Sequence, residues 1–74
     1  MASAKILVID DEEKLRSLMK RIISLEGFTV SEAGNLKQAE KLIEKEQPEV
    51  LLCDVKLPDG NGVDFVSKIK TKYP

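Results

Sequence analysis

Short apolar runs and longer amphipathic stretches alternate along this chain. Residues 5–9 (KILVI) and 50–53 (VLLC) are nearly continuous in apolar character, which is typical of parallel strands covered by helices on both faces. Residues 28–32 (FTVSE) alternate between apolar and polar positions, as in a half-exposed strand at the edge of a sheet. The pattern therefore predicts two buried strands and one edge strand.

Apolar residues recur at helical spacing in each stretch that follows a strand. Residues 12–26 predict an amphipathic helix that Asp11 caps and Gly27 ends. A second helix is expected after Asn35, with Gln38 as the far side of a capping box, and a third follows the next turn. The apolar stripes of the three helices are Leu15, Leu18, Met19, Ile22 and Ile23, then Leu36, Ala39, Leu42 and Ile43, then Val63, Phe65, Val66 and Ile69.

Strands and helices thus alternate in the order β-α-β-α-β-α. Such alternation predicts an α/β fold whose parallel strands are joined by right-handed crossovers. Strands one and three are expected to pair, with strand two on the other side of strand one, in the order 2-1-3. Helices would then cover both faces of the three-stranded sheet.

The composition narrows the possible functions. At 74 residues the chain holds one domain at most, and 12 Lys and Arg against 13 Asp and Glu argue against binding along a nucleic-acid backbone. With no His and a single cysteine, Cys53, an internal disulfide, nucleophile–His catalysis and zinc chemistry within one chain are excluded. The longest apolar run is too short to span a membrane and no export signal is evident, so we expect a cytoplasmic protein.

Carboxylates follow two of the predicted strands. Asp10 and Asp11 end the first, and Asp54 ends the third. Because neighbouring parallel strands end at the same edge of the sheet, where ligands bind in open α/β folds, we expect the three carboxylates to converge there. Their mutual repulsion requires a proton or a cation, and hard oxygen ligands without His or thiolate favour Mg²⁺. A carboxylate beside Mg²⁺ can attack a phosphoryl group and form an aspartyl-phosphate.

A purely structural interpretation stays open for part of this set. Asp11 could serve only as a helix cap, and Glu12 only as a favourable charge at the helix N-terminus. Asp54 is harder to explain in this way, because it follows an apolar strand and no capping requirement is evident before Pro58. Two acidic strand ends in one β-α-β frame favour a functional site.

Three segments of the chain resemble the receiver domain of two-component response regulators. They are ILVIDDE at 6–12, LLCD at 51–54 and LPDGNG at 57–62, similar to the family's first strand with its acidic pair, its phosphoacceptor strand and the loop that follows. The resemblance extends over nearly the whole chain and implies a flavodoxin-like fold. The segment DVKLPDGNG at 54–62 also resembles transcription activators of the nitrogen-regulatory type.

The resemblance implies a signalling role rather than an enzymatic one. Asp54 would accept a phosphoryl group from a phosphohistidine on a sensor histidine kinase. Asp11 and Asp54 would be side-chain ligands of Mg²⁺, Asp10 would act on the ion mainly through water, and the main-chain carbonyl of Lys56 would complete the protein ligands. A Mg²⁺-dependent phosphatase, which shares strand-end aspartates, is disfavoured because such enzymes usually carry a second Asp where this chain has Lys56.

The resemblance stops after the third predicted helix. The family's fourth strand with its Ser or Thr, and its fifth strand with its Lys, have no counterpart, so residues 1–74 are expected to form the N-terminal half of a receiver domain. In the order 2-1-3 the third strand then has an open edge, and one sheet face lacks a covering helix. We therefore expect a homodimer that pairs third strands or covers the exposed face, and slow or absent phosphotransfer. The alternative is a structural half-domain that folds by self-association and has no signalling activity.

Overall fold

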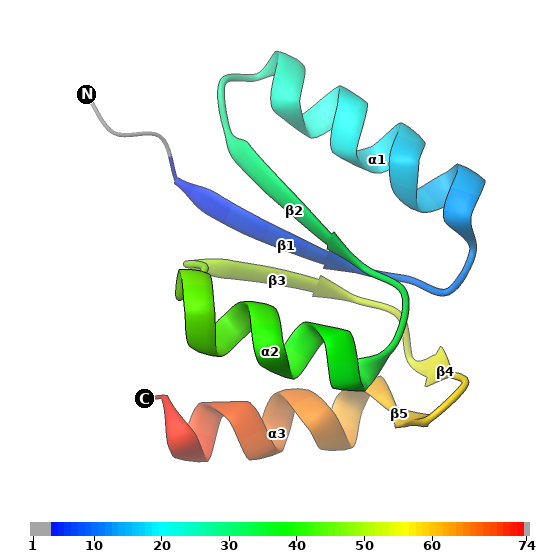
Figure 1. The fold of residues 1–74 in the computed structure, drawn as a ribbon, viewed down its shortest axis with the longest axis vertical. Coiled ribbons are helices and arrows are strands. Elements are labelled where there is room, and N and C mark those ends of the chain that lie inside the picture. The colour runs from blue at the N-terminus through cyan, green and yellow to red at the C-terminus, as the bar shows by residue number, and fades with distance from the viewer. Residues whose placement is uncertain (1–3, 74) are drawn as a thin grey trace.

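The computed structural model describes residues 4–73, which form three parallel strands and three helices (Figure 1). The strands are β1 (Lys5–Ile9), β2 (Thr29–Ala33) and β3 (Val50–Cys53), and the helices are α1 (Glu13–Leu25), α2 (Leu36–Glu46) and α3 (Gly62–Lys72). A short hairpin that was not predicted, β4 (Lys56–Leu57) and β5 (Gly60–Asn61), lies between β3 and α3. None of the helices in this part of the chain has the length and apolar character needed to cross a membrane.

The central strand of the sheet is β1. It pairs in parallel with β2 on one side and with β3 on the other, so that Ile9 lies opposite both Ala33 and Cys53. The strand order is therefore 2-1-3, as predicted. Because β1 and β3 are parallel and end together, the residues that follow them emerge side by side at the carboxyl edge of the sheet.

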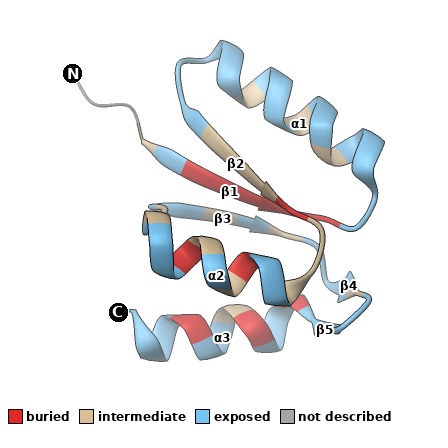
Figure 2. Cartoon of the chain, in the orientation of Figure 1, coloured by how far each residue is buried: buried red, intermediate tan, exposed pale blue. Residues whose placement is uncertain are grey.

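The main core lies between the sheet and the helices α2 and α3, while α1 lies on the opposite face (Figures 1 and 2). Side chains alternate between the two faces of a strand, and Leu7 and Ile9 of β1 point into this core. The buried cluster consists of Leu7, Ile9, Ala33, Ala39, Ile43, Phe65 and Ile69. Val8 on the other face is also fully buried, so the strand that leads to Asp10 is the best-covered element of the fold.

The face of the sheet on which α1 lies is only partly covered. No residue of α1 is buried (Figure 2). Of its apolar stripe, Met19 and Ile23 are half-buried, whereas Leu18 is 52 % and Ile22 55 % exposed. Val50 and Leu52 of β3, which alternate with the core-facing residues of that strand, are exposed as well. The expected uncovered face is therefore present. The prediction that β3 is a buried strand is wrong for this chain, because β3 is an edge strand with one face open.

Two helix starts were predicted, and one of the predictions is wrong. Asp11 does not cap α1: Glu12 occupies the N-cap without a side-chain capping bond, and the Asp10 carboxylate accepts a hydrogen bond from the Glu12 amide (2.9 Å). The helix begins one residue later than predicted, so Asp11 precedes the N-cap, and the bond between Asp10 and the Glu12 amide is not a capping bond. Asn35 caps α2 as predicted, accepting from the Gln38 amide at 2.8 Å.

Two further predictions need small corrections. β2 begins at Thr29 and ends at Ala33, one residue later than predicted, because its ladder with β1 continues to Ala33. Val63 was expected in the apolar stripe of α3 but is 58 % exposed. The helix buries only the side that carries Phe65 and Ile69, and Val63 lies outside it.

Candidate metal centre

Three carboxylates meet at the carboxyl edge of the sheet. Asp10 and Asp11 follow β1, Asp54 follows β3, and one carboxylate oxygen of each lies within 4.8 Å of the others. The convergence predicted from the two strand ends is therefore observed. Just before the cluster, the Asp54 amide donates a hydrogen bond to the Ile9 carbonyl (2.9 Å), which ties the two strand ends together.

The three side chains differ in their surroundings. Asp10 is 9 % exposed and its carboxylate is bonded to the Glu12 amide, whereas Asp11 and Asp54 are exposed. A hollow of about 480 Å³ opens at the cluster, and its other lining residues are Ile9, Glu12, Leu15, Met19, Leu52 and Cys53. Asp11 and Asp54 are thus accessible to a ligand from solvent, while Asp10 is already engaged.

The cluster carries negative charge without a positive partner. Within residues 4–73 no lysine or arginine forms an ion pair with any of the three carboxylates, and the ion pairs nearby join Arg16 and Lys20 to Glu32. A small divalent cation held beside these oxygens would neutralise their charge. The donor set, all oxygen and without His or thiolate, fits Mg²⁺.

The backbone at Asp54 is packed directly against the start of α3. The Gly62 amide donates to the Val55 carbonyl (2.7 Å). A Cβ atom on Gly62 would overlap the carbonyl oxygen of Asp54 and lie 2.9 Å from its carbonyl carbon. This close approach requires glycine at position 62, directly beside the acidic cluster.

Lys56 is the fourth residue of the predicted site. It lies two residues after Asp54, begins β4 and pairs with Asn61 of β5. The group of oxygens that meet at the sheet edge consists of side-chain carboxylates only. That the main-chain carbonyl of Lys56 is a ligand of Mg²⁺ stays a prediction.

Arg16 is a residue of this region that the sequence pattern did not identify. Its guanidinium donates to the Asp10 carbonyl (Nη1, 2.9 Å) and pairs with the Glu32 carboxylate (Nε, 3.1 Å). It thereby joins the first turns of α1 to the ends of β1 and β2. In the sequence Arg16 is one of several polar residues between apolar positions of a helix, and only the fold brings its two partners together.

Cys53 lies directly before Asp54 and packs against the main core. Burial, and after it the charge of Asp54, raise the pKa of the Cys53 thiol. The thiol donates to the Asp54 carbonyl at 3.3 Å. These contacts are typical of a small core residue rather than of a reactive thiol.

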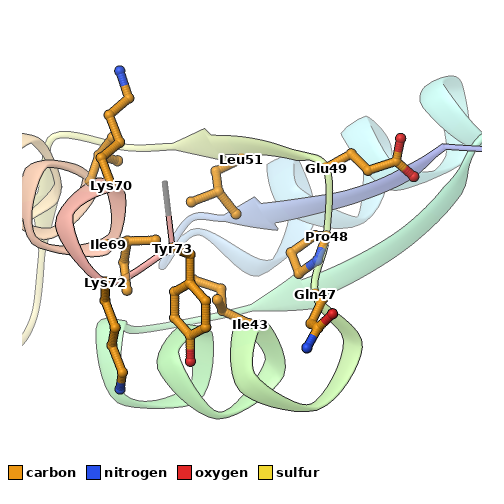
Figure 3. Close-up of a pocket in the computed structure, with 10 residues that line it drawn as sticks. Ile43, Gln47, Pro48, Glu49, Leu51, Ile69, Lys70, Lys72 and Tyr73 are labelled. Carbon is orange, nitrogen blue, oxygen red and sulfur yellow. The ribbon is translucent and has the colours of Figure 1, made fainter.

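A larger hollow lies at the other edge of the sheet. It has a volume of about 1020 Å³ and lies between the C-terminal ends of α2 and α3 and the start of β3, with Ile43, Leu51 and Ile69 among its lining residues (Figure 3). Of its charged side chains, Glu49 precedes β3 and Lys70 and Lys72 lie on α3, and they form no ion pair in the described part of the chain. The acidic cluster is therefore the better candidate for chemistry, although its hollow is smaller.

Comparison with known proteins identifies the family. A model of the response regulator receiver domain matches residues 6–74. The chain belongs to this family. The receiver domain is 33 % identical over 70 residues to sporulation initiation phosphotransferase F of Bacillus subtilis, covering 95 % of this chain and 56 % of that protein. It is 32 % identical over 74 residues to the DNA-binding transcriptional regulator NtrC of Proteus hauseri, covering 100 % of this chain and 16 % of that protein.

The fold of this receiver domain is similar to that of solved relatives. Response regulator protein TrrA of Thermotoga maritima, solved in complex with Mg²⁺–BeF, matches with a TM-score of 0.89 and 28 % identity, covering 95 % of this chain and 61 % of that one. The flavodoxin-like α/β fold is thus confirmed. The chain spans about half the length of the phosphotransferase and a smaller part of NtrC. Its sequence identity to NtrC (32 %) is no greater than its identity to the phosphotransferase (33 %). The resemblance to nitrogen-regulatory activators therefore does not distinguish this group from other response regulators.

Proposed function

We propose that this receiver domain accepts a phosphoryl group on Asp54, with Mg²⁺ held by Asp11, Asp54, the main-chain carbonyl of Lys56 and, through water, Asp10. The observation that carries the proposal is the convergence of three uncompensated carboxylates at the carboxyl edge of a receiver-family sheet. The exposure of Asp54 supports access by a phosphodonor. The complex of the related protein TrrA with Mg²⁺–BeF supports Mg²⁺ as the ion.

The proposed donor is a phosphohistidine on a sensor histidine kinase. A carboxylate oxygen of Asp54 attacks the phosphorus, an oxygen–phosphorus bond forms, and the bond between phosphorus and the imidazole nitrogen breaks, returning its electron pair to the nitrogen. Bound Mg²⁺ would neutralise charge on the phosphoryl oxygens. The Glu12 amide keeps the Asp10 carboxylate oriented through its hydrogen bond.

Metal binding is tested by titrating the 74-residue chain with Mg²⁺ while amide chemical shifts are recorded. We expect saturable shifts at residues 10–12 and 53–57 in the millimolar range, and their loss in Asp54→Asn. Asp64→Asn is the matched control, because Asp64 is an exposed carboxylate in the first turn of α3 outside the cluster. A wild-type chain without Mg²⁺-dependent shifts near Asp54 would refute the metal site.

Phosphorylation is tested with acetyl phosphate and Mg²⁺, followed by intact mass and by peptide mapping. We expect slow gain of one phosphoryl group on Asp54, because the family's Ser or Thr of strand four and Lys of strand five have no counterpart in these residues. Rapid gain would contradict the expected slowness. Modification of another residue, with Asp54 unmodified, would contradict the assignment of Asp54.

A second proposal concerns association, and it rests on exposed apolar residues. We define the α1–β3 apolar face as Leu15, Leu18, Ile22, Val50 and Leu52, each at least 38 % exposed. Exposed apolar patches of this kind mark interaction surfaces, and the net charge of −1 produces little repulsion between copies. We propose that the 74-residue chain forms a homodimer by covering this face or by pairing β3 edges. Folding by self-association, without signalling, is the alternative function.

Sedimentation equilibrium over a concentration series tests the homodimer. Leu18→Glu places a charge on the α1–β3 apolar face and is expected to shift the equilibrium toward monomer. Val63→Glu is the matched control, since Val63 is similarly exposed but lies on α3, outside that face. A wild-type chain that is folded and strictly monomeric at micromolar concentration would refute the proposal.

A further inference from the structure

The hairpin that follows Asp54 is attached to a helix far away in the sequence. In the β4–β5 turn, the Asp59 carboxylate accepts a hydrogen bond from the Leu36 amide (Oδ1, 2.9 Å) and another from the Lys37 amide (Oδ2, 3.1 Å). These amides belong to the first two residues of α2. Asp59 is therefore a helix cap supplied from a different element.

The N-terminus of α2 uses a local cap and this remote cap together. Asn35 accepts from the Gln38 amide, and the Gln38 side chain accepts from the Gly34 amide, both at 2.8 Å. The first amides of a helix have no partner within the helix, and the local cap leaves two of them unpaired. Asp59 takes both. The two caps are complementary, and only the remote one connects α2 to the hairpin.

Packing and charge reinforce the attachment. An added Cβ atom on Gly60 would lie 2.8 Å from Leu36 Cδ1, so the hairpin and the start of α2 are in close contact beside the hydrogen bonds. Leu57, at the other end of the turn, packs against the main core. The helix amides lower the pKa of Asp59, so its carboxylate is ionised at neutral pH and lies at the positive end of the α2 dipole.

We propose that Asp59 is a positioning residue for the metal site: by fixing the hairpin to α2, it sets the position of the Lys56 main-chain carbonyl. The pairing of Lys56 with Asn61 and of Leu57 with Gly60 joins the anchored turn to the Lys56 backbone over two residue pairs. A hairpin this short has few contacts of its own, and its geometry depends on its anchors. The inference rests on the Mg²⁺ binding proposed above.

The hairpin has a second anchor on the side of the metal site. Its far strand leads directly into α3, where the Gly62 amide is bonded to the Val55 carbonyl. Lys56 follows Val55, so its backbone lies between this anchor and the one made by Asp59. Loss of Asp59 would remove the two hydrogen bonds between the turn and α2 and leave the turn held there by apolar contacts alone, so the Lys56 carbonyl would sample a wider range of positions.

Mg²⁺ titration of Asp59→Ala and Asn35→Ala tests the proposal. Both variants remove a cap from α2, but only Asp59→Ala detaches the hairpin. We expect Asp59→Ala to weaken Mg²⁺ binding on the order of 10-fold, as for outer partners that orient a metal ligand, and Asn35→Ala to change it less than about twofold. Asp59→Asn retains one acceptor oxygen and is expected to fall between wild type and Asp59→Ala.

The titration distinguishes failure of the positioning role of Asp59 from failure of the proposed Mg²⁺ site. Unchanged affinity in Asp59→Ala, or an equal loss in Asn35→Ala, would overturn the positioning role while leaving the proposed Mg²⁺ site intact. A wild-type chain that does not respond to Mg²⁺ would overturn the proposed function, and the positioning role with it. The amide spectrum of each variant shows whether it is folded, and Asp59→Asn serves in place of Asp59→Ala if the latter is not.

Discussion

Replacing Gly62 with alanine places a methyl group where the backbone of Asp54 already lies. The added Cβ overlaps the Asp54 carbonyl oxygen and lies 2.9 Å from its carbonyl carbon and 3.0 Å from Cys53 Sγ. Two of these three atoms are backbone, so no flexible side chain can move aside. The start of α3 and the end of β3 must separate by on the order of 1 Å to restore an ordinary carbon contact of about 3.5 Å.

The cost of Gly62→Ala follows from this displacement. Overpacking of this kind costs about 1–3 kcal/mol, and the better helix propensity of alanine returns at most about 1 kcal/mol. We therefore expect the free energy of unfolding to fall by about 1–2 kcal/mol. The displacement also moves Asp54 relative to Asp10 and Asp11. Since misplacement of a site by about 1 Å can cost on the order of 100-fold in rate, we expect Mg²⁺ affinity to fall by at least about 10-fold.

Urea unfolding and Mg²⁺ titration of the same samples measure both effects. Gly27→Ala is the matched control: Gly27 has a φ of +95° and nothing within 4 Å of an added Cβ, so its cost comes from the backbone alone, about 1–2 kcal/mol. Gly27 lies between α1 and β2, at the edge of the sheet opposite the carboxylates, and its variant should bind Mg²⁺ normally. A Gly62→Ala chain with wild-type stability and Mg²⁺ affinity would refute the reasoning.

Three further predictions concern charges. Asp54→Asn relieves like-charge repulsion and should raise the metal-free stability in urea by about 1 kcal/mol; a loss of stability would contradict this. Arg16→Ala breaks the partly buried pair with Glu32 and should cost about 1–3 kcal/mol, against at most about 0.5 kcal/mol for the more exposed Lys20→Ala, compared in the same assay. The pKa of Asp59 is lowered in the folded chain, so its stabilisation is present above the unfolded pKa of about 3.9 and is lost as the pH falls through the lower folded pKa. The stability difference between wild type and Asp59→Asn should shrink over that acid range, and a difference independent of pH would contradict it.

The fold and the acidic cluster were predictable because both follow from local patterns and the geometry of parallel strands. Apolar runs ending in aspartate locate strand ends, and adjacent parallel strands bring Asp10, Asp11 and Asp54 to one edge. The start of α1 was not predictable in this way. The pattern fits a cap at Asp11, whereas the helix begins one residue later, with Glu12 at the N-cap and no side-chain capping bond.

The remote contacts could not be predicted for a different reason. An aspartate between Pro58 and Gly60 is explained by its turn alone, and nothing in the sequence connects Asp59 with amides at the start of α2. Similarly, the periodicity of α1 predicts an apolar side but not whether another element covers it, and the exposure of Leu18 and Ile22 follows only from the arrangement of the elements. A sequence pattern indicates whether a residue favours burial or a hydrogen bond. Which element covers it, or which amide donates to it, is determined by the tertiary fold.

The central position of β1 has a consequence for how the chain folds. Its two partners lie far along the sequence: Lys5 pairs with Thr29 and Ile6 with Val50. The chain segment between β1 and β2 is shorter than the one between β1 and β3, so pairing β1 with β2 costs less entropy. We therefore expect β1, α1 and β2 to assemble first and β3 to be added afterwards. Before β2 pairs with it, the segment KILVI of β1 is an unpaired apolar strand with high β-propensity. Such segments are prone to pair between chains. The strand that is best protected in the folded receiver domain is thus open to pairing between chains until β2 and β3 cover its two edges.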